Sequence, residues 1–197
     1  MKPIIKDAFF DSVRHRVFNG HLNGSQVEGL ELMIDFFEAQ SNDDTRHLGY
    51  MMGTAYHETG GTMLPITEWG GESYFTKHYE DNKAVAKALG NIYPGDGAKY
   101  CGRGYVQLTG RHNYTKFGKL LSIDLVTHPE FALDPKIAMQ IMYRGMKEGL
   151  FTGKSFSNFF NETTDDWIHA RQIVNGMDRA GVIAGYGLKF FDAIVHK

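Results

Sequence analysis

Several features that would place this 197-residue sequence in a special class are scarce or missing. It holds a single cysteine, Cys101, so no disulfide can form within the chain, and folding does not depend on an oxidising compartment. No apolar run approaches the roughly 18 residues of a membrane-spanning helix. Residues 1–10 also lack the apolar core of a signal peptide. We therefore expect a protein that folds in the cytoplasm and is not inserted in a membrane.

An excess of positive charge is also missing. The formal net charge is −2, and the lysines and arginines are dispersed, which argues against nucleic-acid binding. Nine histidines are present, but none has a paired ligand spacing such as HExxH, so we predict neither a metal site nor a cofactor. No linker or repeat divides the chain, and we expect one domain spanning residues 1–197 in a monomer.

Helical periodicity is the main pattern that is present. Apolar residues recur three and four positions apart in most of the sequence, and Asp134-Pro135 combines a helix cap with a proline at the first helical position. The predicted helices span residues 7–19, 25–40, 45–59, 84–89, 111–121, 135–149, 165–174 and 180–194. The second starts at a capping-box pattern of Ser25 and Glu28. A polar break at residues 41–44 precedes the third.

The remaining segments contain helix breakers. Residues 62–80 carry no clean period and are predicted to be irregular or weakly β, and residues 91–104 are predicted to form a loop. A short strand is expected at residues 105–109, which would direct the side chains of Gln107 and Thr109 to the same side. The fold class that follows is mainly α with a small β element.

Residues 56–72 carry the most suggestive chemistry. A predicted helix ends at a glycine pair and leaves His57 and Glu58 in its last turn, and Glu68 and Glu72 follow in a glycine-rich loop. Cleavage of a glycosidic bond needs one protonated carboxyl group and one carboxylate that acts as base or nucleophile. The helix dipole and apolar neighbours disfavour the anion of Glu58, which suits the acid, and the polar loop suits a base. From the spacing alone, it is equally possible that these residues are ordinary solvated glutamates on the surface.

Three motifs occur in order along the chain. They are His57-Glu58-Thr59-Gly60-Gly61, Tyr100-Cys101-Gly102-Arg103-Gly104-Tyr105-Val106-Gln107-Leu108-Thr109-Gly110 and Ile173-Val174-Asn175-Gly176. Together they resemble glycoside hydrolase family 19, which contains chitinases and related phage endolysins, and the similarity covers roughly residues 45–195. The resemblance implies a lysozyme-like (α+β) fold of two mainly helical lobes with a substrate groove between them.

The resemblance also implies roles for individual residues. Glu58 would be the general acid, and Glu68 would be the base, as in the endolysin-like branch of the family. Glu72 remains an alternative base, as does Glu80 if the plant-type separation applies. Thr109 would help to hold the attacking water. The implied substrate contacts are His57, Arg103, Gln107, Asn113, Tyr114 and Asn175.

Several of these residues have an ordinary structural interpretation as well. Gln107 and Thr109 taken alone are more often plain strand residues, Asn175 before glycine also suits a helix C-cap, and His57 suits a helix end. Arg179 is a candidate partner for a catalytic carboxylate, although a solvated surface arginine is the more common case. A nucleophilic Cys101 in a cysteine amidase or peptidase acting on the same polymer ranks below the glycosidase interpretation.

The function expected from these features is peptidoglycan hydrolysis by a muramidase. The mechanism would be inverting, with the two carboxyl groups roughly 6.5 to 9.5 Å apart. The sequence lacks the cysteine-rich binding module of plant chitinases, and no separate wall-binding domain is expected, which favours a phage or prophage endolysin in host lysis. Such a protein would reach the cell wall from the host cytoplasm through a hole-forming partner. A chitinase on the same fold and a non-catalytic glycan-binding virion module are the alternatives.

Overall fold

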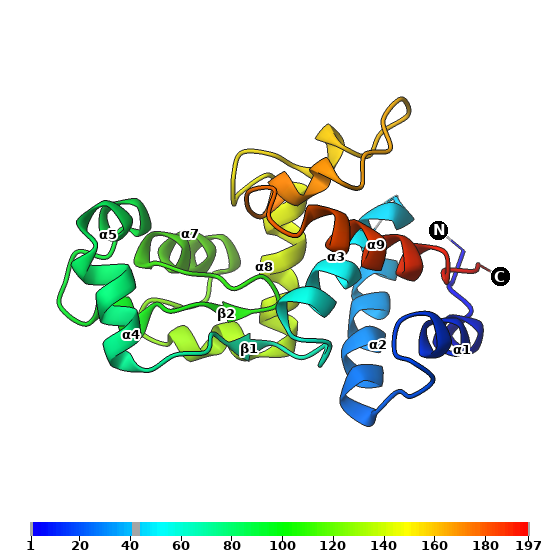
Figure 1. Ribbon diagram of the computed structural model, residues 1–197, viewed down its shortest axis with the longest axis horizontal. Coiled ribbons are helices and arrows are strands. Elements are labelled where there is room, and N and C mark those ends of the chain that lie inside the picture. The colour runs from blue at the N-terminus through cyan, green and yellow to red at the C-terminus, as the bar shows by residue number, and fades with distance from the viewer. Residues whose placement is uncertain (1, 41–43, 197) are drawn as a thin grey trace. The chain divides into compact units, whose positions relative to one another are not determined.

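The computed structural model describes residues 2–40 and 44–196 (Figure 1). Most of the polar break predicted at residues 41–44 lies outside the described residues. The chain divides into two compact units, one of Met1–Leu64 with Met142–Lys197 and one of Pro65–Ile141. The predicted mainly α architecture with a small β element is confirmed. No helix among the described residues is long and apolar enough to span a membrane.

The first unit is helical. Its elements are α1 Lys6–Arg16, α2 Gly24–Glu38, α3 Thr45–Glu58, the 3₁₀ helices η3 Phe156–Asn158 and η4 His169–Ile173, and α9 Ala180–Phe191. Residues 48–55 of α3 are all buried, so this helix forms the centre of the unit. It was predicted with nearly the same bounds. Its last residue is Glu58, and the helix ends there because the glycines that follow have positive φ.

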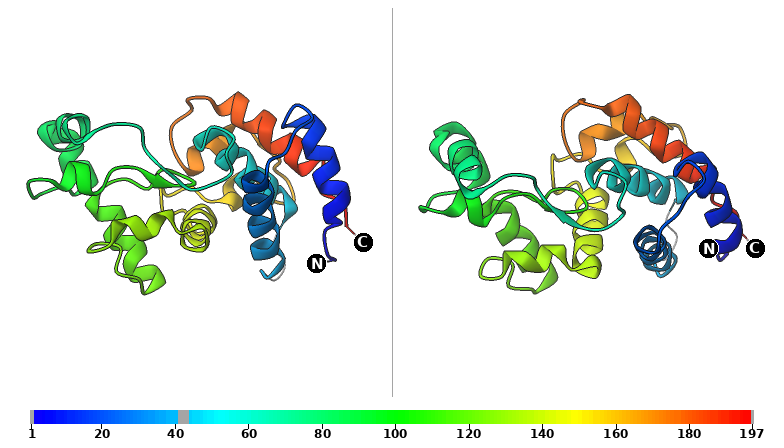
Figure 2. Two further views of the ribbon diagram at one scale, coloured as in Figure 1. Left: turned by 90° about the horizontal axis from the view of Figure 1, so that it is seen from below. Right: turned by 60° about the horizontal axis from the view of Figure 1, so that its bottom comes forward.

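Helices α3 and α9 lie side by side (Figures 1 and 2). Their contact depends on small residues, because a methyl group on Gly53 would lie 2.4 Å from the backbone nitrogen of Gly187. The aromatic ring of Trp167 in turn covers Gly187, at 3.1 Å from the position of a methyl group there. Close backbone packing of this kind fixes the position of α3 in the unit.

The start of α2 differs in detail from the prediction. The capping residue is Asn23, whose side-chain oxygen accepts a hydrogen bond of 2.9 Å from the backbone nitrogen of Gln26. The side chain of Gln26 accepts one of 3.0 Å from the backbone of Asn23. The capping box therefore uses Asn23 and Gln26 in place of Ser25 and Glu28, because asparagine and glutamine supply the same acceptors two residues earlier.

The second unit contains the small sheet. Its elements are β1 Ile66–Thr67, α4 Glu72–Thr76, the π-helix η1 Lys77–Asp81, α5 Lys83–Leu89, α6 Asp96–Lys99, β2 Arg103–Gly104, α7 Arg111–Leu121 and the 3₁₀ helix η2 Pro129–Leu133. Helix α8 Pro135–Lys147 starts in this unit and ends in the first. As predicted, Asp134 caps it, with its carboxylate accepting from the backbone nitrogens of Lys136 and Ile137.

Three predicted segments are corrected by the structure. Residues 72–81 are helical, in α4 and η1, although the segment 62–80 was predicted to be irregular. The helix predicted at residues 165–174 is only the 3₁₀ helix η4. The predicted strand at residues 105–109 is wrong, because residues 105–107 form a turn and the strand residues are those of β2.

The turn after β2 explains the last of these errors. Strand β2 pairs antiparallel with β1, and Arg103 also bridges to Leu108, so the chain reverses direction between them. The reversal places Gln107 in the left-handed region, at φ 54°. Tyr105 and Val106 are apolar because they are buried in this turn, and their pattern imitates a strand.

Candidate active site

Glu58 occupies the C-terminal end of α3 and is paired with an arginine. Its carboxylate Oε1 accepts a hydrogen bond of 2.8 Å from Nη1 of Arg171. The side chain of Arg171 is only 6% exposed and that of Glu58 is 19% exposed. The Nε atom of Arg171 donates to the backbone oxygen of Asp178 at 3.2 Å. A buried cation with these two acceptors is well fixed, and it holds the carboxylate of Glu58 in one orientation.

The sequence analysis missed Arg171. It considered Arg179 as a partner for a catalytic carboxylate, but Arg179 is exposed at the start of α9, as the more conservative interpretation held. Arg171 lies on η4 between the buried residues Ala170 and Ile173. An arginine inside an apolar pattern is a usable signal, because a buried guanidinium requires a partner of opposite charge.

Glu68 follows β1 in the second unit and is held by two donors. The hydroxyl of Tyr79 donates to its Oε1 at 2.6 Å, and the backbone nitrogen of Gly102 donates to its Oε2 at 3.1 Å. The backbone nitrogen of Glu68 also donates to the oxygen of Gly102, at 2.8 Å. Burial and the hydrogen bond to Glu68 raise the pKa of Tyr79, so its hydroxyl remains a donor. We call these three residues the Glu68 cradle.

Tyr79 belongs to the π-helix η1, in the segment that the sequence did not predict to be helical. Short π-helical turns are rare and are frequent at functional sites. The ring of Tyr79 is parallel to that of Phe75, with the ring centroids 6.1 Å apart, and Phe75 is buried. This packing directs the hydroxyl of Tyr79 at the carboxylate of Glu68.

Two further predicted residues gather at the cradle. A methyl group placed on Gly102 would lie 2.9 Å from Oε1 of Gln107, 3.0 Å from Oε2 of Glu68 and 3.2 Å from Oγ1 of Thr109. The hydroxyl of Thr109 donates to the backbone oxygen of Gln107 at 2.9 Å. The structure therefore brings Glu68, Gln107 and Thr109 together around one glycine. A turn brings these side chains together, whereas the sequence predicted that they would alternate along a strand.

The remaining predicted contacts of the second unit are mostly supporting residues. Tyr114 was expected to line a groove, but it is fully buried, and its hydroxyl donates to the backbone oxygen of Cys101 at 2.9 Å. Burial raises the pKa of Tyr114 to about 12. The guanidinium of Arg103 donates to this hydroxyl at 3.0 Å. Asn113 donates to the backbone oxygen of Thr109 at 2.8 Å, so it positions Thr109.

The two predicted contacts of the first unit lie on either side of the Glu58–Arg171 pair in the chain. His57 is half-buried directly before Glu58. Asn175 is exposed after η4, and its side-chain oxygen accepts from the backbone nitrogen of Gly176 at 2.8 Å. That bond uses the side-chain oxygen and does not involve the amide nitrogen.

The two alternative carboxylates have different environments. Glu72 is exposed in the first turn of α4. The carboxylate of Glu80 accepts from the backbone nitrogens of Gly95 and Gly97, at 2.9 and 3.2 Å, and so holds the start of α6. The contacts of Glu80 are structural, and only Glu68 adjoins both Gln107 and Thr109.

Other chemistries find little support in the described residues. Cys101 is buried, and burial raises the pKa of its thiol, which disfavours the thiolate that a cysteine nucleophile needs. No group of three histidine, cysteine or acidic side chains within residues 2–40 and 44–196 is placed to hold a metal ion.

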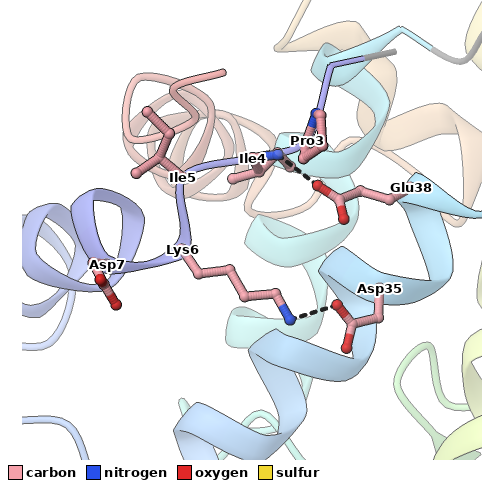
Figure 3. Close-up of a pocket in the computed structure, with 7 residues that line it drawn as sticks. All are labelled: Pro3, Ile4, Ile5, Lys6, Asp7, Asp35 and Glu38. Atoms are coloured by element: carbon pink, nitrogen blue, oxygen red, sulfur yellow. Dashed lines mark hydrogen bonds and ion pairs between the residues drawn. The ribbon is translucent and has the colours of Figure 1, made fainter. Parts of the chain in front are cut away.

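A pocket at the start of α1 holds none of the predicted site residues (Figure 3). Two contacts join residues that line it: Lys6 contacts Asp35 at 2.5 Å, and the backbone nitrogen of Ile4 donates to Glu38 at 2.5 Å. These contacts fasten the start of the chain to α2. They give the pocket a structural explanation.

Comparison with known proteins identifies the family. The family model described as Chitinase class I matches residues 34–146, which include Glu58, Glu68 and Thr109. The chain is 27% identical to an endochitinase of Arabidopsis thaliana over 142 residues, which are 71% of this chain and 47% of that protein. It is 35% identical to an acidic endochitinase of Petunia hybrida over 94 residues, which are 46% of this chain and 32% of that protein. The chain thus spans less than half the length of these relatives.

Solved structures show the same fold. The chain is similar to chitinase C from Streptomyces griseus, with a TM-score of 0.61 and 18% identity, over 95% of this chain and 74% of that one. A mutant of chitinase C gives a TM-score of 0.56 and 21% identity, over 96% of this chain and 90% of that one. The family model matches more than half of the residues of this chain. The chain therefore belongs to glycoside hydrolase family 19, the family of class I chitinases.

Proposed function

We propose that this protein hydrolyses β-1,4 glycosidic bonds between amino sugars, with chitin as the first candidate substrate. The observation that carries the proposal is the cradle, in which a carboxylate with two fixed donors adjoins a threonine and a glutamine. Family membership and the names of the relatives, which are endochitinases, support the substrate class. Peptidoglycan, which the sequence analysis preferred, is the second candidate.

Glu68 is proposed as the base. Its two donors hold the carboxylate in one orientation, and a carboxylate held in this way can take a proton from water. The hydroxyl of Thr109 already donates to a backbone oxygen, so its own oxygen is left to accept a hydrogen from water. A water molecule that donates one hydrogen to Thr109 and the other to Glu68 has a lone pair directed away from both. That lone pair would attack the anomeric carbon.

Glu58 is proposed as the acid that protonates the glycosidic oxygen. It ends a helix within the segment matched by the family model, and Arg171 fixes its orientation. The proposal requires Glu58 and Glu68 to reach the same glycosidic bond. For an inverting reaction their carboxyl groups would be about 6.5 to 9.5 Å apart in the glycan complex. A crystal structure of that complex measures this separation.

Substitution of each carboxylate tests the assignment. Glu58→Gln and Glu68→Gln are expected to lower the release of reducing ends from colloidal chitin by about 10²- to 10⁴-fold, the usual contribution of acid–base catalysis. Glu72→Gln is the matched control, because Glu72 is an exposed glutamate of the same loop region, and it should leave the rate unchanged. Full activity of a folded Glu58→Gln protein would show that the mechanism is wrong. Glycan binding without any release of reducing ends by the unchanged protein would favour a glycan-binding module.

The anomeric form of the product tests the stereochemistry. An inverting enzyme releases the α-anomer from a β-linked polymer, and NMR spectra recorded in the first minutes of the reaction distinguish it from the β-anomer. Initial release of the β-anomer would mean retention, and would make the second carboxylate a nucleophile.

Parallel digestions of peptidoglycan and chitin distinguish the two candidate substrates. The lone buried cysteine gives the protein no disulfide, unlike a typical secreted plant enzyme, and this observation keeps the endolysin role as the second candidate. New reducing ends on N-acetylmuramic acid would show a muramidase, and those on N-acetylglucosamine a glucosaminidase. Freed peptides without new reducing ends would exclude the glycosidase proposal. If the protein is an endolysin, lysis in a bacterial host should require co-expression of a hole-forming membrane protein.

A further inference from the structure

Trp69 is the most exposed large apolar residue that the structure describes. Its side chain is 90% exposed, although it directly follows Glu68, whose carboxylate is held on both oxygens. Single exposed apolar residues are common on protein surfaces. A tryptophan is different, because its large ring system is usually buried or committed to an interface. Core packing does not explain why Trp69 is at this position.

A second and a third ring lie close to Gly70, the residue that follows Trp69. Gly70 packs directly against Tyr74, since a methyl group on Gly70 would lie 2.7 Å from Cδ1 of that ring. Tyr74 is 45% exposed, and its ring centroid is 4.3 Å from that of His78. The segment after Glu68 is therefore bordered by Trp69, Tyr74 and His78, which we call the aromatic ridge.

The aromatic ridge and the Glu68 cradle share their support. Tyr74 contacts the buried Phe75 edge to face, with centroids 5.5 Å apart, and the other side of the Phe75 ring is parallel to Tyr79. Tyr79 is the residue that donates to Glu68. Helices α4 and η1 thus carry Tyr74 and His78 and also the donor that holds the carboxylate, while Trp69 is the residue after Glu68 in the chain. A ligand stacked on Trp69 would therefore be bound close to the carboxylate.

The chemistry of the ridge selects its ligand. One face of a pyranose ring carries C–H groups and is apolar, while its edge carries hydroxyl and acetamido groups. An exposed indole offers a flat apolar face of similar size, and tyrosine and histidine offer polar edges. The neighbouring carboxylate of Glu68 would repel an anionic polymer and not an uncharged sugar. A neutral amino sugar satisfies each of these conditions.

We propose that Trp69, supported by Tyr74, is a stacking platform that holds one uncharged N-acetylated amino-sugar ring of the glycan strand beside Glu68. The proposal rests on the proposed glycosidase function, because the strand that stacks here is the one that is cut. It assigns to Trp69 a role in binding and positioning the substrate. It assigns no proton transfer to the indole.

Intrinsic fluorescence provides a direct test. The chain has two tryptophans, and the other one, Trp167, is buried. The N-acetylglucosamine hexasaccharide is titrated into the Glu58→Gln protein, which should bind it without cutting it. Stacking should shift the emission to shorter wavelength, since the exposed indole loses water. The shift should disappear when Trp69→Phe is added, while most of the affinity should remain, because phenylalanine keeps an aromatic face.

Affinity and kinetics complete the test. Trp69→Ala should weaken hexasaccharide binding, measured by calorimetry, and raise KM by about tenfold, equivalent to about 1.4 kcal/mol, with a small effect on kcat. Ile92→Ala is the matched control, because Ile92 is 69% exposed on the same unit and is not part of the ridge. It should change neither quantity.

The outcomes separate this proposal from the proposed function. If the enzyme releases reducing ends but Trp69→Ala leaves Kd and KM unchanged, the platform is wrong and the glycosidase assignment stands. If the hexasaccharide shifts the emission of Trp69 but no glycosidic bond is ever cut, the platform stands and the catalytic proposal fails. Equal losses of affinity in Trp69→Ala and Trp69→Phe would also overturn the proposal, because they would show that stacking on an aromatic face is not the source of binding.

Discussion

Replacement of Gly102 by alanine tests the Glu68 cradle. The added methyl group would lie 3.0 Å from Oε2 of Glu68 and 2.9 Å from Oε1 of Gln107. An ordinary contact begins near 3.4 Å, so each side chain must retreat by about 0.4 to 0.5 Å. The retreat stretches the bond of 3.1 Å between the backbone nitrogen of Gly102 and Glu68. Glu68 would still have its carboxylate, but the carboxylate would no longer be held in the same position.

The Gly102→Ala substitution is expected to lower the rate of the reaction while the protein stays folded. Gly102 does not have a left-handed φ, so alanine fits the backbone, and the loss of freedom in the unfolded chain stabilises by about 0.4 to 1 kcal/mol. Displaced side-chain ends cost about 0.5 to 1.5 kcal/mol each at most. With two displaced side chains the net destabilisation is about 0 to 2.6 kcal/mol, so the melting temperature should fall by no more than about 10 °C. A misplaced reacting group, in contrast, lowers the rate by up to about 10²-fold, or about 2.7 kcal/mol.

The assay compares kcat on a soluble chito-oligosaccharide with the thermal unfolding temperature. Gly24→Ala is the control, because a methyl group on Gly24 meets no atom within 4 Å. It should leave kcat unchanged. Wild-type kcat in a folded Gly102→Ala protein would refute the reasoning, because it would show that the contacts around Gly102 do not position the base.

Three further predictions concern single side chains. Tyr79→Phe removes the hydroxyl that donates to Glu68, and should lower kcat about tenfold while the protein stays folded; an unchanged kcat would show that this bond is dispensable. Arg171→Met leaves the half-buried carboxylate of Glu58 without its cation, and should destabilise the fold by about 1 to 3 kcal/mol in chemical denaturation. An unchanged free energy of unfolding would show that the ion pair with Glu58 does not stabilise the fold. Burial raises the pKa of Asp96, but hydrogen bonds from an arginine and from backbone nitrogens lower it more, so the net pKa lies below its ordinary value. Its charge therefore stabilises the fold above about pH 4, and this contribution is lost as the pH falls through the folded-state pKa, so Asp96→Asn should flatten the fall of unfolding free energy in acid.

The sequence predicts the long helices well, because their signals are local. Helix α7 has the predicted bounds, and α3 differs from the prediction by one residue at its end. Each has an apolar face and a clear stop, such as the glycine pair after α3. Between Thr62 and Thr109 the helix predicted at residues 84–89 is confirmed by α5, but α4, η1, α6 and β2 were not predicted, because these short elements are fixed by contacts distant in sequence. Glu80, for example, holds the start of α6 fifteen residues later.

The candidate site shows the same difference between local signals and contacts distant in sequence. The motifs indicate Glu58 and Thr109 as candidates, and the spacing within the family indicates Glu68, but neither indicates the residues that hold these side chains in place. Tyr79 lies in a π-helix, whose five-residue hydrogen-bond period has no distinct apolar pattern, so its approach to Glu68 is invisible in the sequence. Arg171 is 113 residues from Glu58, and only the folded chain shows which carboxylate it meets.

The Glu58–Arg171 pair changes the argument for the acid. The sequence argument relied on the helix dipole, which disfavours the anion of Glu58 by about 0.3 to 1 kcal/mol. A guanidinium that donates to the carboxylate at 2.8 Å acts in the opposite direction, and hydrogen bonds to charged groups contribute about 1.5 to 3 kcal/mol. The arginine therefore opposes the dipole, and the position of Glu58 at the end of a helix does not by itself identify the acid. The assignment of Glu58 as the acid therefore rests on the family match and on the Glu58→Gln protein, which should still bind the hexasaccharide but should no longer cut it.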